Sequence, residues 1–261
     1  MVYILLPAYN EERDIEPLLN RIHQSMQSLQ YAQYKILVVN DGSTDGTLAV
    51  ITRYQRSMPV EILDHRVNKG LGQAMLTGLS RAAELIQDDD VLISMDADNT
   101  HNPQLIGAMI DKIRSGYDLV IASRYEKGGE EVGLSRYRSF LSRCVSNLLL
   151  IFFPIPGAKD YSCGYRAYRG CMLKKAFQIY GDQWVEERGF TCMAEILIKL
   201  SRMNIRVTEV PLVLRYDLKS GQSKMKVLRT ILRYFVLISH NYNKRLVPGR
   251  LYSGHNNKPI E

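Results

Sequence analysis

Five short apolar segments alternate with amphipathic segments in the first half of the chain, and this alternation limits the fold more than any other feature. The apolar segments are rich in Val, Ile and Leu on both faces, as strands buried in a parallel sheet are; they cover 2–6, 35–39, 60–63, 91–95 and 119–122. Between them, apolar residues recur at helical spacing, as in Ile15, Leu18, Leu19, Ile22, Met26 and Leu29. The pattern predicts an α/β fold with a doubly wound, mainly parallel sheet flanked by helices.

The second half of the chain is less regular. Just before it, at the end of the first half, a helix is predicted to begin at Asn102-Pro103, because Asn is a good N-cap and Pro suits the first helical position. Further helices are predicted over 135–153, 171–179, 191–203 and from about Ser223, with a strand over 206–210. Because no low-complexity linker interrupts the chain, we expect one domain over 1–243, with halves 1–125 and 126–243, and a polar tail over 244–261.

The net charge of the chain limits the classes of partner that it is expected to bind. With 34 Lys and Arg against 27 Asp and Glu, the formal net charge is +7, which suits nucleic acid, an anionic membrane surface or phosphorylated substrates. No nucleic-acid recognition motif or basic-aromatic cluster is present, so nucleic acid is not expected as a partner. The four cysteines form no CxxC pair, which argues against a disulfide scaffold and a structural zinc site.

Neither of the two most apolar segments has the form of a membrane span, which requires about 20 apolar residues. The segment 148–156 is too short, and 227–239 contains Arg229 and Arg233. The N-terminus lacks the basic lead of a signal peptide. We therefore expect a cytoplasmic protein.

Acidic and polar residues follow several predicted strands, which is where parallel sheets bind their ligands. Asp96-Ala97-Asp98 follows the most apolar strand, and alternate carboxylates there can face one cation. Mg²⁺ is usually held by one or two carboxylates together with substrate phosphates. A solvated acidic turn has the same sequence, so this motif alone leaves both interpretations open.

Two further segments favour helix starts. Residues 41–47, DGSTDGT, follow the second strand and can cap the next helix. Residues 69–74, KGLGQA, lack the third glycine of a dinucleotide fingerprint and the Gly-Lys-Ser/Thr of a phosphate loop. We interpret this second segment as a helix start too.

Taken together, seven ordered motifs resemble family 2 glycosyltransferases with the GT-A fold. They are PAYNEE (7–12), VVNDGSTDGT (38–47), NKGLGQAMLTG (68–78), DAD (96–98), ASRY (122–125), KDYSCGYRAYR (159–169) and SGQSKMK (220–226). The last three are similar to the branch that contains dolichol-phosphate mannosyltransferase and its polyprenyl-phosphate relatives. The resemblance implies a nucleotide-sugar-binding half over 1–125 and an acceptor-binding, membrane-facing half over 126–243.

The resemblance also assigns site residues. It implies that the donor is bound by Pro7, Tyr9, Glu11, Val39, Asp41, Asp96, Ala97, Asp98, Arg215 and Lys224. It further implies that Asp96 and Asp98 hold Mg²⁺ or Mn²⁺, that Arg124, Arg138 and Ser142 bind the acceptor phosphate, and that Asp98 and Arg124 are catalytic. The family's glutamine two positions after the second aspartate is replaced by Thr100, which leaves Thr100 and His101 as alternatives for a third metal ligand.

These assignments imply an inverting, metal-dependent transfer of one hexose, mannose by family default. The donor would be GDP-mannose or a UDP-sugar, and the acceptor dolichyl or polyprenyl phosphate at the cytoplasmic membrane face. A phosphate acceptor needs no general base, because a phosphomonoester with a second pKa of about 6 is already an anion. The basic helix over 135–153 becomes wholly apolar at its end, as helices at membrane surfaces do. We expect a peripheral membrane protein, or one that relies on a separate membrane-protein partner.

Two other functions remain open at this point. The same fold can transfer sugar to a hydroxyl of a glycolipid or polysaccharide, which requires a carboxylate base. Alternatively, the chain is a catalytically silent subunit that binds nucleotide sugar.

The apolar residues 148–156 are equally compatible with an ordinary core.

Overall fold

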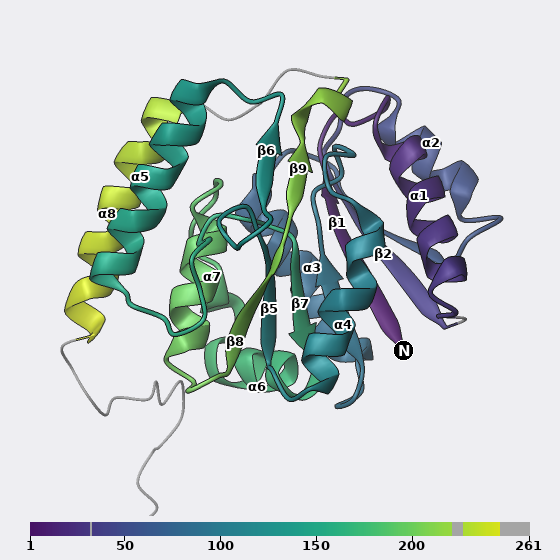
Figure 1. The fold of residues 1–261 in the computed structure, drawn as a ribbon. Helices are drawn as coiled ribbons and strands as arrows, with labels where there is room; N and C mark the ends of the chain where they lie inside the picture. The colour runs from purple at the N-terminus through teal and green to yellow at the C-terminus, as the bar shows by residue number, and fades with distance from the viewer. Residues whose placement is uncertain (32, 221–226, 246–261) are drawn as a thin grey trace, which may run out of the picture.

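The central feature of the protein is a seven-stranded sheet with the strand order β3-β2-β1-β4-β7-β5-β8 (Figure 1). The structure is a computed structural model that describes residues 1–31, 33–220 and 227–245. Neighbouring strands are parallel, except that β7 runs antiparallel to both β4 and β5. The strands are β1 (Val2–Ala8), β2 (Tyr34–Asp41), β3 (Val60–His65), β4 (Val91–Ser94), β5 (Leu119–Ser123), β7 (Arg166–Arg169) and β8 (Val207–Pro211). The predicted mainly parallel sheet is confirmed, and so are all five strands predicted in the first half.

Helices cover both faces of this sheet (Figure 1). On one face lie α1 (Ile15–Ser28), α2 (Thr47–Tyr54) and α4 (Ile106–Arg114); on the other lie α3 (Leu71–Leu85), α6 (Gly170–Tyr180) and α7 (Cys192–Ser201). Two short 3₁₀ helices, η1 (Pro103–Leu105) and η2 (Gly181–Trp184), precede α4 and follow α6. The predicted cap is present, since the Asn102 side chain accepts a hydrogen bond from the Gln104 N–H at 3.2 Å.

Three strands were not predicted. β7 carries two arginines, yet Arg166 is fully buried because its guanidinium donates to the carbonyls of Met193 (2.7 Å) and Tyr161 (2.8 Å). The other two, β6 (Glu130–Val132) and β9 (Val213–Arg215), are three residues long and pair in parallel as a separate small sheet. The 3₁₀ helix η3 (Tyr216–Leu218) follows β9.

Two long helices, α5 (Arg136–Phe152) and α8 (Val227–Arg245), pack side by side at one edge of the molecule (Figure 1). Both confirm predicted helices, although the predicted start of the second, Ser223, lies outside the described residues. Leu149 of α5 and Tyr234 and Leu237 of α8 are buried. Within the described part of the chain, no helix combines the length and the apolar character that crossing a membrane requires.

Candidate active site

A cavity of about 550 Å³ opens at the carboxyl ends of β1, β2 and β4, the edge where parallel sheets bind ligands. Its walls come from both halves of the chain, including the start of α3 and the facing sides of α5 and α8. Ten predicted site residues line it: Pro7, Tyr9, Glu11, Asp41, Asp96, Ala97, Asp98, Arg124, Arg138 and Ser142. The fold therefore brings motifs that are far apart in the sequence into one pocket.

Two predicted donor-binding residues do not line this pocket, and a third lies outside the described residues. Val39 is fully buried within β2. Arg215 ends β9 with its side chain 44% exposed, and its guanidinium pairs with the Asp217 carboxylate at 2.6 and 2.8 Å. Lys224 lies outside the described residues. Their donor contacts stay predictions, and this geometry gives those of Val39 and Arg215 no support.

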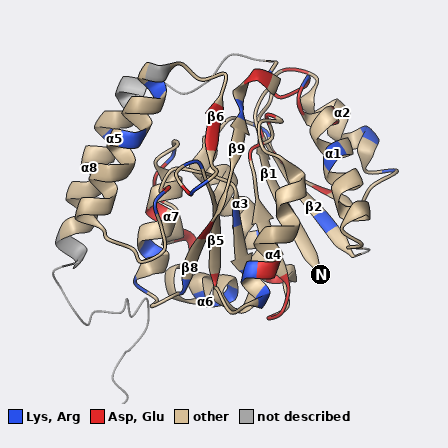
Figure 2. Cartoon of the chain, in the orientation of Figure 1, with Lys and Arg blue, Asp and Glu red and all other residues tan. Residues whose placement is uncertain are grey.

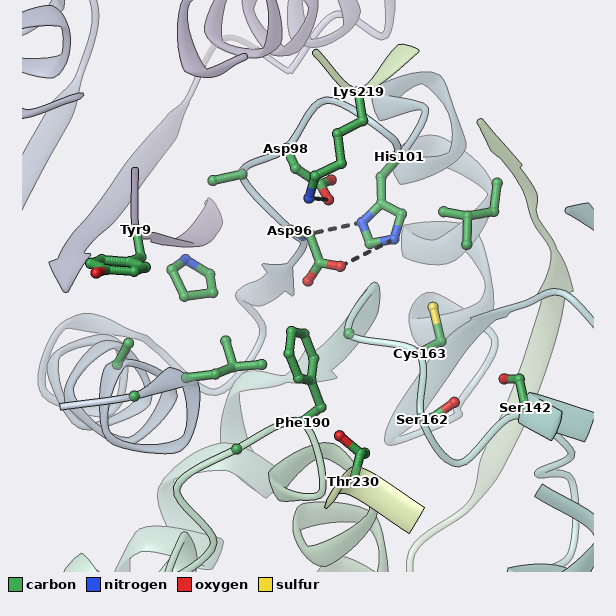
Figure 3. A pocket seen from close by; sticks show the side chains of 18 of the residues that line it. Tyr9, Asp96, Asp98, His101, Ser142, Ser162, Cys163, Phe190, Lys219 and Thr230 are labelled. Atoms are coloured by element: carbon green, nitrogen blue, oxygen red, sulfur yellow. Dashed lines mark hydrogen bonds and ion pairs between the residues drawn. The ribbon is translucent and has the colours of Figure 1, made fainter. Parts of the chain in front are cut away.

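Asp98 lies two residues beyond Asp96 and is held from two sides (Figure 3). Its Oδ1 accepts hydrogen bonds from the Thr100 hydroxyl (2.6 Å) and the Thr100 N–H (3.3 Å), and its Oδ2 accepts one from Lys219 Nζ at 2.7 Å. Burial raises the pKa of the Asp98 carboxyl, but the Lys219 ammonium and these hydrogen bonds outweigh burial and hold the pKa below its ordinary value. Asp98 is therefore ionised at neutral pH.

Asp96 is oriented by His101. The Asp96 N–H donates to His101 Nδ1 at 3.1 Å, and the His101 ring stacks on Tyr165 with 5.0 Å between ring centroids. Because Nδ1 accepts a hydrogen bond, the neutral ring carries its proton on Nε2, which lies 3.9 Å from Asp96 Oδ2 (Figure 3). The side chain of Asp96 is 43% exposed, and it lines the pocket.

The two carboxylates fit a hard divalent cation that takes its remaining ligands from phosphate oxygens and water. In the part of the chain that the structure describes, no third protein ligand is arranged beside them. The Thr100 hydroxyl is bonded to Asp98, and the protonated nitrogen of His101 faces Asp96. Over residues 1–31, 33–220 and 227–245, no cluster of three His, Cys, Asp or Glu side chains could hold a metal ion. The choice between Thr100 and His101 therefore stays open.

Asp41 shapes the wall of the pocket. Its buried carboxylate accepts hydrogen bonds from the His65 ring (2.8 Å), the Asn68 amide (3.0 Å) and the backbone N–H groups of Lys69 and Gly70 (both 2.9 Å). These bonds fix the turn that precedes α3, where Gly70 has a φ of 92° and no room for a side chain. The predicted helix start in this segment is confirmed, and the carboxylate of Asp41 is already occupied.

Arg124 is buried, and each of its five N–H groups has an acceptor. Nε and Nη2 donate to the two carboxylate oxygens of Asp160, both at 2.7 Å, and Nη2 also donates to Ser162 at 2.7 Å. Nη1 donates to Glu131 (3.1 Å) and Ser142 (3.3 Å). Burial lowers the pKa of the Arg124 guanidinium, but Asp160 raises it well above its ordinary value. A phosphate that binds Arg124 must therefore displace one of these acceptors, such as Glu131, Ser142 or Ser162.

Basic and apolar side chains from the segments that contain α5 and α8 also line the pocket. Arg138 and Ser142 from α5 lie there with the apolar side chains Leu134, Leu141, Val145, Ile231 and Tyr234. Among the described residues, no carboxylate on α5 or α8 lines the pocket, because neither helix contains an acidic residue. One pocket thus combines paired carboxylates, an arginine and an apolar surface.

Lys219 and Phe190 are two of the lining residues that were not predicted from the sequence. Lys219 stands directly before the motif at 220–226, which gave a positional signal but no sign that its side chain reaches Asp98. Phe190 lies in the loop before α7 and faces the pocket opposite Asp96 (Figure 3). No spacing in the sequence distinguishes Phe190 from a core aromatic residue.

Comparison with proteins of known sequence places this pocket in a family context. The model of the family "Glycosyl transferase family 2" matches residues 3–177. A dolichol-phosphate mannosyltransferase of Pyrococcus furiosus is 32% identical over 234 residues, which are 89% of this chain and 61% of the relative. A polyprenol monophosphomannose synthase of Mycolicibacterium smegmatis is 32% identical over 224 residues, 85% of this chain and 80% of that protein. The chain thus spans less than two thirds of the Pyrococcus relative.

Solved structures support the fold. Glucosyl-3-phosphoglycerate synthase from Mycobacterium tuberculosis, crystallised with Mn²⁺, UDP and phosphoglyceric acid, superposes with a TM-score of 0.64 at 16% identity. The match covers 96% of this chain and 80% of that one. This likeness confirms the expected GT-A fold. The matched family model and the relatives confirm the family that the motifs predicted: the chain belongs to glycosyl transferase family 2 and is a glycosyltransferase.

Proposed function

We propose that the protein transfers one hexose, with mannose the first candidate, from a nucleoside diphosphate sugar to dolichyl or polyprenyl phosphate. The observation that carries this proposal is the combination of groups that line one pocket. The carboxylates of Asp96 and Asp98, the side chains of Arg138 and Ser142, and apolar side chains from α5 and α8 all line it. The names of the similar mannosyltransferases support a lipid phosphate as the acceptor, and GDP-mannose is the first donor to test.

The chemistry of a phosphate acceptor suits this pocket. An acceptor phosphate oxygen attacks the anomeric carbon, a new C–O bond forms with inversion, and the bonding pair of the old C–O bond leaves with the nucleoside diphosphate. No proton has to be removed, since the phosphate is already an anion near neutral pH, and α5 and α8 offer no carboxylate base. Arg138 is placed to position the phosphate through charge-assisted hydrogen bonds. A divalent ion held by Asp96 and Asp98 would offset the charge that develops on the departing diphosphate.

The charge distribution supports a membrane surface as the place of reaction. By sequence, the helices α5 and α8 together carry seven basic residues and no acidic residue, so the rest of the chain, with 27 of each sign, has no formal net charge. Figure 2 shows no acidic residue on the coloured parts of these two helices. Several apolar residues on these two helices are each more than half exposed; they are Tyr137, Phe140, Ile151, Leu232, Phe235 and Val236. Helices with exposed apolar side chains and basic residues bind at the interface of anionic bilayers. We place the protein peripherally on the cytoplasmic membrane face, with or without a membrane-protein partner.

A transfer assay tests the acceptor. Purified protein is incubated with Mg²⁺ or Mn²⁺, a panel of labelled nucleotide sugars and a short polyprenyl phosphate, and the label in the lipid fraction is counted. We expect label in the polyprenyl phosphate and none in the matched free polyprenol, which offers only a hydroxyl. Transfer that requires a hydroxyl acceptor, or no transfer from any donor, contradicts the proposal.

A vesicle assay tests the surface. We expect wild-type protein to sediment with vesicles that contain phosphatidylserine, and the double variant Ile151→Asp/Phe235→Asp to bind at least about tenfold more weakly, because each exposed apolar side chain contributes about 1.5 kcal/mol or more when buried. Val67→Asp, which changes an equally exposed residue before α3, is the control and should bind as wild type does. Equal binding of the double variant and the wild type argues against this surface, as does wild-type protein that stays in the supernatant.

A further inference from the structure

Lys219 reaches Asp98 from a segment 121 residues further along the chain. The side chains of Lys219 and Asp98 are only 11% and 12% exposed, and Nζ lies 2.7 Å from Oδ2. Figure 3 shows the lysine pointing to Asp98 beside Asp96, at the edge of the pocket. An ammonium is thus enclosed with the two carboxylates that the proposed metal site requires.

The lysine occupies the side of Asp98 that a metal ion would need. Thr100 engages Oδ1 through its hydroxyl and its N–H, so Oδ2 is the oxygen that remains for a cation from the pocket. The ammonium is already in contact with that oxygen. Two cations at contact distance from one carboxylate oxygen repel each other strongly in a site that is largely shielded from water.

The backbone around Lys219 is fastened in place. On one side, the Arg215 N–H donates to the Thr100 carbonyl at 3.2 Å. On the other, the Ser220 N–H donates at 3.1 Å to the carboxylate of Asp14, which is 3% exposed. The side chain itself has four carbons and can move without its backbone. The contact with Asp98 is therefore built into the fold, while its release requires only a side-chain rotation.

We propose that Lys219 is an internal competitor of the divalent ion: it neutralises Asp98 while the donor is absent, and the metal must displace it. This proposal rests on the proposed metal site at Asp96 and Asp98. After the metal displaces it, the Lys219 ammonium remains beside the pocket. There it can form charge-assisted hydrogen bonds with the diphosphate of the donor. The site therefore binds the metal weakly alone and more tightly together with the donor.

Titration of Mn²⁺ without nucleotide tests this role, with free Mn²⁺ measured by electron paramagnetic resonance. We expect Lys219→Gln to lower the dissociation constant of Mn²⁺ about tenfold, because a hydrogen bond between charged groups no longer has to be broken. Lys219→Met, which keeps an unbranched side chain of similar length without its charge, should shift the constant in the same direction. Lys112→Gln makes the same change of charge at an exposed position in α4 and should bind Mn²⁺ as wild type does.

Several results overturn the proposal. They are an unchanged or weaker Mn²⁺ affinity in both Lys219 variants, an equal gain in Lys112→Gln, or no Mn²⁺ binding by any variant. Adding Asp98→Asn to Lys219→Gln is expected to remove the gain, and a gain that persists also contradicts competition at Asp98. None of these measurements involves sugar transfer. Protein that binds Mn²⁺ as expected but transfers no sugar therefore overturns the proposed reaction and retains the role of Lys219.

Discussion

Replacing Asp98 with asparagine is expected to lower the rate of sugar transfer by about 1000-fold, the scale of loss when a group that stabilises transition-state charge is removed. Asparagine keeps the size of the side chain, and its amide oxygen can still accept the Thr100 hydroxyl that lies 2.6 Å from Asp98 Oδ1. What it lacks is the negative charge that pairs with Asp96 to hold the cation. Initial rates measured over a series of Mn²⁺ concentrations check this expectation.

Two variants serve as references for that measurement. Asp88→Asn removes a carboxylate that is 67% exposed and pairs with Lys174 outside the pocket, so its rate should stay within about twofold of wild type, as expected of a surface change. Arg138→Ala should lose less activity than Asp98→Asn, mainly through a higher KM for the lipid phosphate. A rate for Asp98→Asn within tenfold of wild type, or a larger loss in Arg138→Ala, contradicts the metal role of Asp98.

The sheet could be predicted where burial leaves a simple pattern in the sequence. The strands β1, β2, β4 and β5 are buried on both faces, so each appears as a continuous apolar run. β7 is also a central strand, but its two arginines interrupt the apolar pattern that would have predicted it. Arg166 can be buried there because its guanidinium donates to the backbone carbonyls of Met193 and Tyr161, which lie outside β7. The three-residue strands β6 and β9 are too short for any periodicity to be recognised.

The site could be predicted where its residues follow strands or recur in ordered motifs. Asp96 and Asp98 follow β4, and the topology of the sheet then places them at the ligand-binding edge. Ion pairs between distant segments leave no such trace. The partner of Asp98 is 121 residues away, and that of Arg124 is 36 residues away at Asp160. The sequence thus indicated which residues gather at the pocket, but not which of their charges are already matched within the protein.

Asp160→Ala is expected to lower the free energy of unfolding by about 3–5 kcal/mol, because it leaves the buried guanidinium of Arg124 without its main partner. Asp160 is fully buried and Arg124 is 8% exposed, so water cannot replace the lost carboxylate without opening the structure. The backbone N–H groups of Ser162 and Cys163 also lose their acceptor, at 3.3 and 3.1 Å. Urea denaturation followed by circular dichroism gives the difference.

Acidification provides an independent check on the same pair. Burial raises the pKa of Asp160, but Arg124 and the hydrogen bonds of the site hold it below its ordinary value in the folded protein. The stabilisation by Asp160 is then present above the unfolded-state pKa of about 4 and is lost as the pH falls through the lower folded-state pKa. Wild type and Asp160→Ala should therefore converge in stability as the pH falls below about 4. The control is Lys159→Ala, which breaks the adjacent exposed pair with Glu126; its stability should differ little from that of wild type over the whole pH range. A loss below about 1 kcal/mol in Asp160→Ala at pH 7, the value typical of exposed pairs, would show that the buried guanidinium of Arg124 does not depend on Asp160.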